Sequence, residues 1–234
     1  KNGNPVLMIG IKTPSEDNYI GVEKQIFIQA PILKVSEFIE NFESYFPDYT
    51  NTAPWDIVNE LDKILLDKIK NLSGDYKIEG QVAIHKTAVI EHGVTLKGTI
   101  IISENCCVGA HAYLRGPILL GKAVKIGPGS EIKQSFISDN TAVAHFNYIG
   151  NILIGQNINF EAGSICANHY NERKNKNISV KYKDNIINTH SDKFGSLLGD
   201  NSRVGANAVL SPGTILDKNI IVKRLQLIEQ LIEE

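Results

Sequence analysis

Two basic residues, Arg115 and Lys133, lie eighteen residues apart, and each directly follows an aliphatic residue, Leu114 or Ile132. If the chain coils with eighteen residues per turn, the two cations are neighbours about 5 Å apart on successive turns. At that distance they repel by roughly 1 kcal/mol in water and about 3 kcal/mol at a surface-like dielectric constant. A bound anion reverses this repulsion, and a guanidinium beside an ammonium suits a phosphate. The alternative is that both side chains are simply solvated.

Further polar residues follow within less than two such turns, and they are His145, Tyr148, Asn159 and Asn168. A histidine whose pKa is near the ordinary value of about 6.5 can accept a proton from an attacking amine, so His145 is a candidate general base. With seventeen residues per turn in this part of the chain, Ala162 lies above His145 and leaves room for a ligand. The alternative is a structural histidine that is hydrogen-bonded between turns.

Aliphatic residues that recur every six positions define the elements that must position these side chains. We call them anchor residues: Ile84, Ile90, Leu96, Ile102, Val108, Leu114, Leu120, Ile126 and Ile132; then, after one-residue shifts, Ile137, Val143, Ile149, Ile154, Phe160 and Cys166; and finally Leu198, Val204, Leu210, Leu216 and Val222. An α-helix has 3.6 residues per turn and cannot keep residues six apart on one side. Short parallel strands wound into a three-sided coil can, because each repeat forms one side and points its anchor inward.

The chain on either side of this repeat is different. Residues 1–79 are predicted to form a small α/β region, with helices over 36–46 and 54–72 and with strands in the segments PVLMIGIK and KQIFIQAPI. A basic loop, residues 167–197, interrupts the repeat. Residues 223–234 are predicted to form an amphipathic helix that caps the last turn of the coil, because the end of a solenoid needs a cover.

The composition excludes several classes of function. The 234 residues carry a net charge of −2, which gives no basic surplus for non-specific nucleic-acid binding. We find no apolar run long enough to cross a bilayer and no secretory signal at the start, so no membrane partner is expected. The three cysteines, Cys106, Cys107 and Cys166, are odd in number and two of them are adjacent, so they do not form a disulfide framework. A reducing cytoplasm is therefore the simplest location.

Four motifs add a resemblance to a known family. AYLRG, GSEIK, AHFNYIG and NINFEAGSICAN occur in that order between residues 112 and 168. They resemble the hexapeptide-repeat acyltransferases, in particular the acetyltransferase half of the bifunctional enzymes that make UDP-N-acetylglucosamine. The resemblance covers residues 80–222 and implies a left-handed parallel β-helix there. Residues 1–79 contain no glycine-rich phosphate loop and are too few for the family's nucleotidyltransferase domain, so uridylyl transfer is not expected.

The resemblance also implies roles for single residues. These are His145 as the general base, Arg115 and Lys133 as phosphate and sugar binders, Tyr148 and Asn159 as sugar contacts, Asn168 as a further residue near the site, Ala162 as the residue whose backbone N–H faces the acyl group, and Ala162 and Ala206 as contacts to the cofactor. The cofactor implied is acetyl-CoA as acyl donor. The implied assembly is a homotrimer with sites between copies, which would also cover the apolar residues Phe136, Phe146 and Phe194. The tyrosine that follows the last asparagine in the family is replaced by His169.

The sequence therefore predicts an acetyl-CoA-dependent N-acetyltransferase that acts on an amino-sugar phosphate, similar to glucosamine-1-phosphate. An acyltransferase acting on a nucleotide-linked amino sugar is an alternative. A non-catalytic β-helix that serves in assembly is another. A zinc γ-carbonic anhydrase has the same fold, but it needs histidines that meet on adjacent turns. His85, His92, His111 and His145 offer no such pairing, so no metal is expected.

Overall fold

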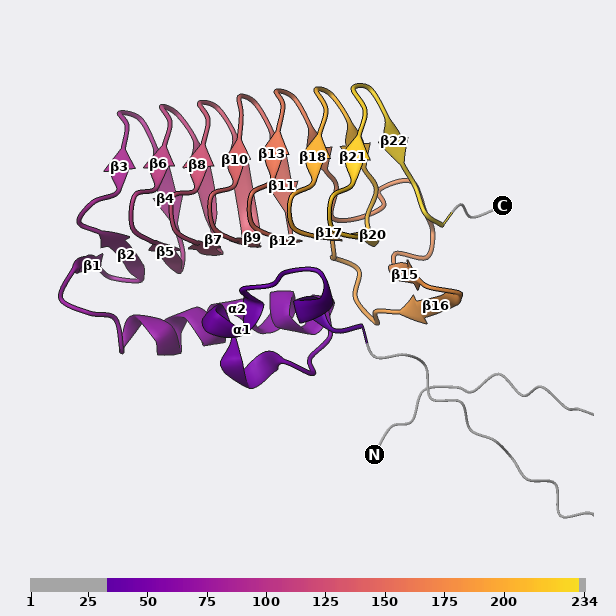
Figure 1. Cartoon of the computed structure of the whole chain (residues 1–234), viewed down its shortest axis with the longest axis horizontal. Helices are drawn as coiled ribbons and strands as arrows, with labels where there is room; N and C mark the ends of the chain where they lie inside the picture. The colour runs from indigo at the N-terminus through magenta and orange to yellow at the C-terminus, as the bar shows by residue number, and fades with distance from the viewer. Residues whose placement is uncertain (1–32, 232–234) are drawn as a thin grey trace, which may run out of the picture. The chain divides into compact units, whose positions relative to one another are not determined.

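The computed structural model describes residues 33–231. Most of them form a left-handed parallel β-helix, a coil of short strands with three sides, and helices lie along one side (Figure 1). The three-sided coil predicted from the six-residue repeat and the left-handed form implied by the family resemblance are therefore confirmed. The segments PVLMIGIK and KQIFIQAPI, predicted as strands, lie outside the described residues.

Each side of the coil is a ladder of parallel strands, and we name the sides the first, second and third face. The first face consists of β3 (Val89–Ile90), β6 (Cys107–Val108), β8 (Lys125–Ile126), β10 (Ala142–Val143), β13 (Asn159–Phe160), β18 (Arg203–Val204) and β21 (Ile221–Val222). The second face consists of β4 (Thr95–Lys97), the first parts of β7 (Tyr113–Leu120) and β9 (Glu131–Ile137), β11 (Tyr148–Gly150), β14 (Ile165–Cys166), β19 (Val209–Leu210) and β22 (Leu227–Ile228). The third face consists of β2 (Val82–His85), β5 (Ile100–Ile102), the last parts of β7 and β9, β12 (Leu153–Ile154), β17 (Ser196–Leu198) and β20 (Thr214–Leu216).

The anchor residues fill the interior of the coil. Every anchor from Ile102 to Val222 is at most 7% exposed, and together they form one continuous apolar core. Where the spacing of the anchors shifts by one residue, the turn of the coil is one residue shorter. Leu114 pairs with Ile132 eighteen residues later, whereas Ile132 pairs with Ile149 only seventeen residues later. This register decides which residues stand above one another on the outer surface.

The corners between faces repeat one backbone conformation. At most corners, the residue three positions before the anchor has a positive φ, as in Asn105 (59°), Asn157 (57°) and Asn219 (64°). Asparagine and glycine tolerate this left-handed region at the lowest cost. This requirement explains why asparagine and glycine punctuate the repeat.

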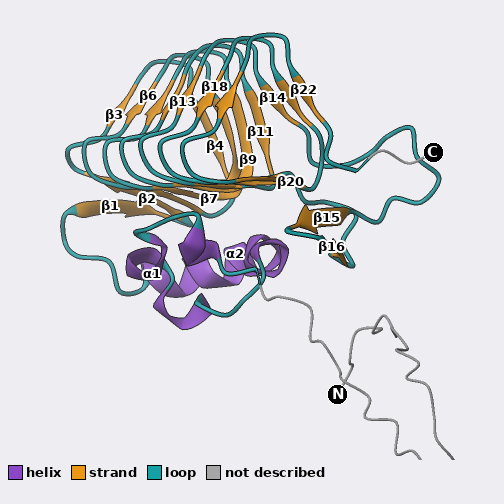
Figure 2. Cartoon of the chain, turned by 45° about the vertical axis from the view of Figure 1, so that its right-hand side comes forward, coloured by secondary structure: helices purple, strands orange, loops and turns teal. Residues whose placement is uncertain are grey.

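The third face is covered by the helices that precede the coil (Figure 2). Its outward side chains form a single apolar column, consisting of Ala83, Ile101, Leu119, Phe136, Leu153, Leu197 and Ile215, and each pairs in register with the next. Helix α2 (Pro54–Ile69) begins at a proline and buries Ile57, Leu61, Ile64 and Leu65 against this column. The helix predicted over residues 54–72 is therefore present, but it ends three residues earlier, at Ile69, which is half-buried.

This cover corrects one expectation about assembly. We expected Phe136, Phe146 and Phe194 to need a neighbouring copy. Phe136 instead packs edge-on against Phe46 at 5.0 Å between ring centroids, and Phe194 packs edge-on against Trp55 at 5.9 Å. Both phenylalanines are fully buried within one chain. Only Phe146 is exposed, with 74% of its surface accessible.

The helix predicted over residues 36–46 is broken. A 3-10 turn (Val35–Glu37) comes first, a short helix α1 (Phe42–Tyr45) follows, and a second 3-10 turn (Pro47–Tyr49) leads toward α2. Asp200 explains the break, because its backbone N–H donates to the carbonyl oxygen of Phe38 at 2.9 Å and its carboxylate accepts from the N–H of Glu40 at 2.9 Å. Those two groups would otherwise continue the helical ladder. These two hydrogen bonds attach the helical segment that covers the third face to the coil at Asp200.

The capping helix predicted over residues 223–234 is wrong for its described part, residues 223–231. The chain there continues the coil and forms β22, in which Leu227 pairs with Val209 and Ile228 pairs with Leu210. Ile228 lies six residues after the anchor Val222, so the repeat runs one step further than we expected. The side-chain amide of Gln230 then makes two hydrogen bonds of 2.8 Å to the backbone of Ile215, in place of a further strand.

The loop over residues 167–197 leaves the coil after β14 and rejoins it at β17. It contains an antiparallel hairpin of β15 (Ser179–Tyr182) and β16 (Asn185–Asn188). A second antiparallel pair, β1 (Tyr76–Glu79) with β2, closes the other end of the third face (Figure 1). The cover and the loop therefore both lie next to the third face, and the first and second faces carry the candidate site.

Candidate functional site

The second face carries a row of cations. Arg115 and Lys133 are directly paired in the register of β7 and β9, so the stacking predicted from their spacing is confirmed. Lys97 pairs with Arg115 in the turn before, which extends the row to three residues. We call Lys97, Arg115 and Lys133 the cation ladder. The sequence prediction missed Lys97, although it also lies eighteen residues before Arg115.

Arg115 and Lys133 differ in their partners. The Arg115 guanidinium is 2.6 Å from the carboxylate of Glu131, which lies in the adjacent strand two residues before Lys133. Within residues 33–231 no carboxylate lies within ion-pair distance of the Lys133 ammonium. Burial lowers the pKa of Lys133, and the nearby cations Arg115 and Lys193 lower it further. Of the two predicted cations, Arg115 is therefore paired with a carboxylate and Lys133 is not.

Tyr148 lies on the same face, one turn above Glu131, and Asn168 follows β14 in the turn above that. The Tyr148 ring crosses the open space over Gly150, and its hydroxyl donates to the side-chain oxygen of Asn168 at 3.3 Å. Asn168 is buried and donates in turn to Asn151 at 2.6 Å. His169 lies 3.1 Å from the same Asn168 oxygen. Burial, followed by the charge of Glu131, raises the pKa of Tyr148, so its hydroxyl stays protonated and donates.

His145 lies at the corner between the first and second faces, and its side chain is exposed. Its imidazole has no hydrogen-bond partner among residues 33–231. The backbone oxygen of His145 accepts from the N–H of Gly163 at 3.0 Å, which places Ala162 directly above it in the next turn, as predicted. The imidazole is thus open to solvent, and only a methyl group stands over it.

At the corner between the first and second faces, a carboxylate in one turn can occupy a backbone N–H in the next turn. The amides that have no such carboxylate are open to a ligand. The N–H of Ala110 donates to Glu91 at 2.7 Å, and the N–H of Ala206 donates to Glu161 at 2.8 Å. In both cases the glutamate lies in the turn below, one residue before the residue over which the alanine stands. For Ala162 the corresponding residue below is an alanine, Ala144. Within the described part of the chain, the Ala162 N–H has no hydrogen-bond partner.

Ala206 therefore differs from what we expected of a cofactor contact, because its N–H is already bound. Two hydrogen bonds of 2.7 Å from Arg224, together with the amide of Ala206, lower the pKa of Glu161 to about 2. The Glu161 carboxylate is therefore ionised at any pH at which the protein would be assayed. The backbone of Ala206 is held, and of the two alanines only Ala162 offers an open donor.

Asn159 lies apart from the cation ladder, because it projects from the first face rather than the second. It lines two cavities on that face. One has a volume of about 790 Å³ and is also lined by Arg203, Lys223 and Arg224. The other has a volume of about 430 Å³ and extends toward β6. His145 stands at the corner between Asn159 and the ladder, so a single chain presents the predicted site residues on two adjacent faces.

Histidine and cysteine do not gather around a common point. Within residues 33–231 no three histidine, cysteine, aspartate or glutamate side chains lie close enough to share a metal ion. The expectation that no two histidines meet on adjacent turns is wrong for His92 and His111, which form an edge-on pair with ring centroids 6.2 Å apart. No third ligand joins them in the described part of the chain. In the same range no helix has both the length and the apolar character needed to span a membrane.

Comparison with known proteins agrees with this description. Residues 78–187 match the family model described as the GMPPB C-terminal domain. The chain is 30% identical over 177 residues to a bifunctional sugar-1-phosphate nucleotidylyltransferase/acetyltransferase of Sulfurisphaera tokodaii, with 74% of this chain and 43% of the relative covered. It is 32% identical over 185 residues to the bifunctional protein GlmU of Methanocaldococcus jannaschii, with 77% of this chain and 44% of the relative covered.

The chain thus spans less than half the length of these relatives. A solved hexapeptide transferase family protein from Anaplasma phagocytophilum shares 21% identity, with 65% of this chain and 80% of that chain covered and a TM-score of 0.18. A structural overlap that low supports no conclusion, and the strand register already defines the fold.

The fold is that of a left-handed β-helix protein of the hexapeptide-repeat class. Within that class, the chain resembles the acetyltransferase part of the bifunctional sugar-1-phosphate nucleotidylyltransferase/acetyltransferases. The resemblance drawn from the four motifs is therefore confirmed.

Proposed function

We propose that this protein is an acetyl-CoA-dependent N-acetyltransferase that acts on an amino-sugar phosphate. The observation that carries the proposal is the pairing at one corner of an exposed imidazole, His145, with the open amide N–H of Ala162 directly above it. A proton acceptor and a donor for a developing oxyanion are the two groups that acyl transfer to an amine requires. The cation ladder starts on the adjacent face and supplies charge for a phosphate.

In the proposed mechanism, Lys133 and Arg115 hold the phosphate of the acceptor, while Tyr148, Asn168 and Asn159 orient the sugar. His145 removes a proton from the amine as the nitrogen attacks the thioester carbonyl carbon. The N–H of Ala162 donates to the carbonyl oxygen while negative charge develops there, a contribution of about 3 kcal/mol in comparable oxyanion sites. A C–N bond forms, the C–S bond breaks, and the thiolate of coenzyme A leaves and is protonated.

The residues present suit acetyl-CoA as the acyl donor. The cavity of about 790 Å³ on the first face reaches Glu161, the residue before Ala162, and carries Arg203 and Lys223, whose positive charges match a ligand rich in phosphate. Acetyl-CoA would supply the activated acetyl group, and the chain would contribute the base, the amide donor and the charges. A cytoplasmic location agrees with the three cysteines, which are all free thiols.

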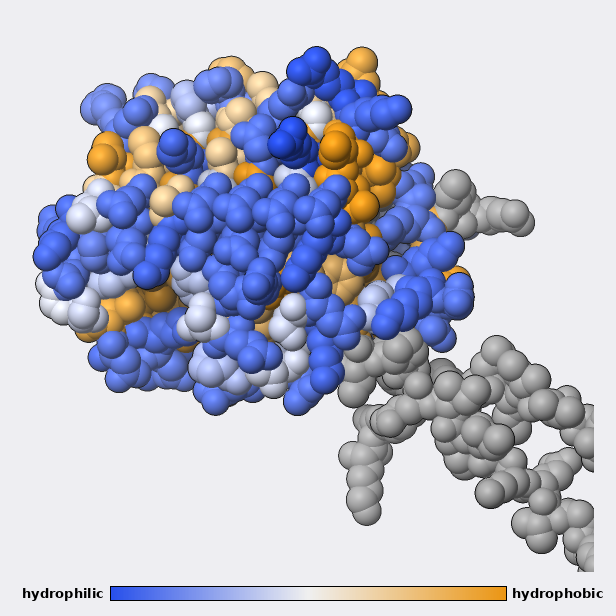
Figure 3. Space-filling model, in the orientation of Figure 1, coloured by the Kyte–Doolittle hydropathy of each residue, from blue (hydrophilic) through white to orange (hydrophobic). Residues whose placement is uncertain are grey.

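We also propose a homotrimer. The ladder and Asn159 lie on different faces of one chain, so a neighbouring copy could bring its first face to the second face of this one. Apolar side chains stand exposed at both ends of the first face, at Val89 in β3 (57% exposed) and Ile221 in β21 (67% exposed). Figure 3 shows patches of hydrophobic surface at the two ends of the coil. Phe146 and Leu225 project from the corner beside the site and are 74% and 78% exposed. Such residues are typical of a surface that is covered in an assembly.

The decisive experiment measures thiol release from acetyl-CoA with amino sugars that are free, phosphorylated or nucleotide-linked. We expect the phosphorylated amino sugar to react fastest. The variant His145→Ala should lower kcat by a factor of about 100 to 10,000 with little change in KM. His190→Ala serves as the matched control, because His190 is exposed in the loop at residues 167–197. Equal rates for His145→Ala and the parent protein would remove the general base from the proposal.

A further inference from the structure

Trp55 joins the helices over the third face to the end of the loop at residues 167–197. It is the second residue of α2, and its ring packs edge-on against that of Phe194 with 5.9 Å between the ring centroids. Trp55 is 7% exposed and Phe194 is fully buried. Phe194 is one of the last residues of the loop, which re-enters the coil at β17. A helix outside the repeat therefore contacts the loop at the point where the loop meets the coil.

The backbone of Phe194 closes the base of the loop. Its N–H donates to the backbone oxygen of Asn168, where the loop begins, at 3.1 Å. Its carbonyl oxygen accepts from the N–H of Gly213, one turn above, at 3.2 Å. The N–H of the next residue, Gly195, donates to the backbone oxygen of Asn151, one turn below, at 2.8 Å. The ring that Trp55 covers thus belongs to the residue that links the two ends of the loop.

Asn168 is the candidate site residue that depends on this closure. The N–H of Ala167 still donates to the next turn of the coil at 3.0 Å, but beyond it the chain leaves the coil, and Phe194 holds the backbone of Asn168 in place of a strand. The side-chain oxygen of Asn168 accepts from Tyr148 at 3.3 Å, and its amide donates to Asn151 at 2.6 Å. Hydrogen bonds are directional, so a shift of the Asn168 backbone would turn its side chain away from Tyr148.

We propose that Trp55 is a positioning residue of the acceptor site and acts through Phe194 on Asn168. Its indole keeps the Phe194 ring packed, the Phe194 N–H holds the backbone of Asn168, and Asn168 then presents its side chain to the sugar beside Tyr148. This inference rests on the proposed function, since it concerns how the acceptor sugar is held. A helix outside the coil thereby contributes to the affinity for the acceptor without touching it.

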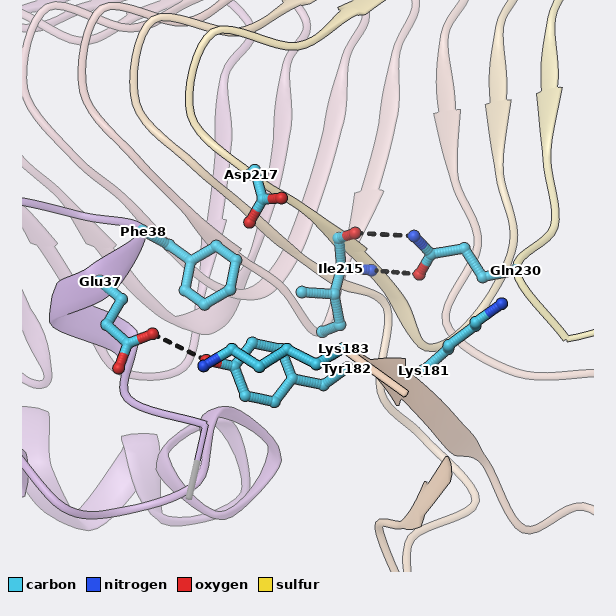
Figure 4. A pocket seen from close by; sticks show the side chains of 8 residues that line it. All are labelled: Glu37, Phe38, Lys181, Tyr182, Lys183, Ile215, Asp217 and Gln230. Atoms are coloured by element: carbon cyan, nitrogen blue, oxygen red, sulfur yellow. Dashed lines mark hydrogen bonds between the residues drawn. The ribbon is translucent and has the colours of Figure 1, made fainter. Parts of the chain in front are cut away.

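A second contact between the loop and the helical segment provides a matched control. The ring of Phe38, which is 2% exposed, lies 6.0 Å from that of Tyr182 in the hairpin of the loop. The Tyr182 hydroxyl donates to Glu37 at 2.7 Å, and these side chains line a cavity of about 500 Å³ (Figure 4). Neither Phe38 nor Tyr182 shares a hydrogen bond or a ring contact with Asn168 in the described part of the chain. Phe38→Ala therefore removes a buried ring from the same contact between loop and helices, but away from the base of the loop.

The test measures binding of glucosamine-1-phosphate to the full chain by titration calorimetry, beside the acetyl-transfer assay. Trp55→Ala should weaken binding about tenfold, the effect of losing one hydrogen bond to the sugar, and should raise KM for the acceptor by a similar factor. The kcat should not change, because the proposed base and amide donor lie at the corner between the first and second faces, away from the loop. Trp55→Phe should restore most of the affinity, and Phe38→Ala should bind like the parent protein. Circular dichroism during urea unfolding checks that each variant is folded, and Trp55→Leu takes the place of Trp55→Ala if the alanine variant is not.

A double-mutant cycle tests whether Trp55 acts through Asn168. Asn168→Ala alone should weaken binding of glucosamine-1-phosphate. Adding Trp55→Ala to it should cause no further loss, because the side chain that Trp55 positions is already absent. Two losses that multiply would show that Trp55 acts by another route, and they would refute the proposal.

The outcomes separate the two proposals. If the parent protein transfers acetyl groups but Trp55→Ala binds the sugar phosphate as well as the parent or Phe38→Ala does, the role of Trp55 is refuted and the proposed function stands. If Trp55→Ala weakens binding in the expected way but the parent protein releases no thiol, the role of Trp55 stands and the acetyltransferase is refuted. If the parent protein does not bind the sugar phosphate, both are refuted.

Discussion

Replacement of Phe136 by alanine tests whether the helices and the coil form one folded unit. Phe136 is fully buried at the middle of the apolar column on the third face, between Leu119 and Leu153. Its ring lies 5.0 Å from that of Phe46 and 5.1 Å from that of Tyr45. Truncation of a buried phenylalanine to alanine costs about 3 to 5 kcal/mol through lost transfer free energy and the cavity left behind. The two aromatic contacts place this site in the upper half of that range, at about 4 kcal/mol.

The assay is urea unfolding followed by the fluorescence of Trp55, the only tryptophan of the chain, which packs edge-on against Phe194 in the same cover. With a denaturant dependence of about 2 kcal/mol per M, a loss of about 4 kcal/mol moves the midpoint down by about 2 M. Phe146→Ala is the matched control, because 74% of the Phe146 side chain is exposed and its loss should cost less than about 0.5 kcal/mol in the dissociated chain. Equal midpoint shifts for the two variants would refute the packing of the helices on the third face.

Two further predictions concern the corner that carries the open amide. The variant Ala144→Glu places a carboxylate below Ala162, in the position that corresponds to that of Glu161 below Ala206. Acetyl transfer should fall at least tenfold in Ala144→Glu, because the carboxylate would occupy the N–H of Ala162, while Ala144→Gly remains active. Unchanged turnover in Ala144→Glu would argue against the Ala162 amide as oxyanion donor. Glu161 should titrate near pH 2 in a carboxyl-carbon NMR experiment, and because its folded pKa lies below the ordinary value, its contribution to stability is present at neutral pH and is lost as the pH falls toward 2. In Arg224→Ala that midpoint should rise toward the ordinary range, and a midpoint that does not move would show that the two side chains do not pair.

The fold could be predicted because the six-residue spacing is the direct result of the geometry. One anchor per side must point inward in every turn, so a mistake in spacing would bury a polar residue. The same logic predicts Lys133 over Arg115 and Ala162 over His145, and the register of the turns confirms both pairs. The turns that are one residue shorter could be predicted as well, because the anchors before and after each one-residue shift show where the shorter turn lies.

The errors lie where a different interaction overrode a local pattern. Residues 223–231 have the apolar spacing of an amphipathic helix, but Leu227 and Ile228 also continue the six-residue repeat, and pairing with β19 satisfies their backbone. The segment 36–46 has helical periodicity, but Asp200 takes the backbone groups that would continue the helix. In both cases the partner is a distant residue that the pattern of the segment itself does not show.

The partners of the site residues were the least predictable part, for a reason that follows from the fold. A solenoid converts position in the sequence into height and face, so spacing tells which residues share a column and how many turns separate them. It does not tell whether a neighbouring carboxylate already holds a given charge, as Glu131 holds Arg115. Nor does it place the loop at residues 167–197, which lies outside the repeat and returns to the coil where the N–H of Gly195 donates to the backbone oxygen of Asn151 at 2.8 Å. Cations in one column of a solenoid therefore differ in the charge that they offer to a ligand, because a cation such as Arg115 is partly neutralised by a carboxylate within the protein.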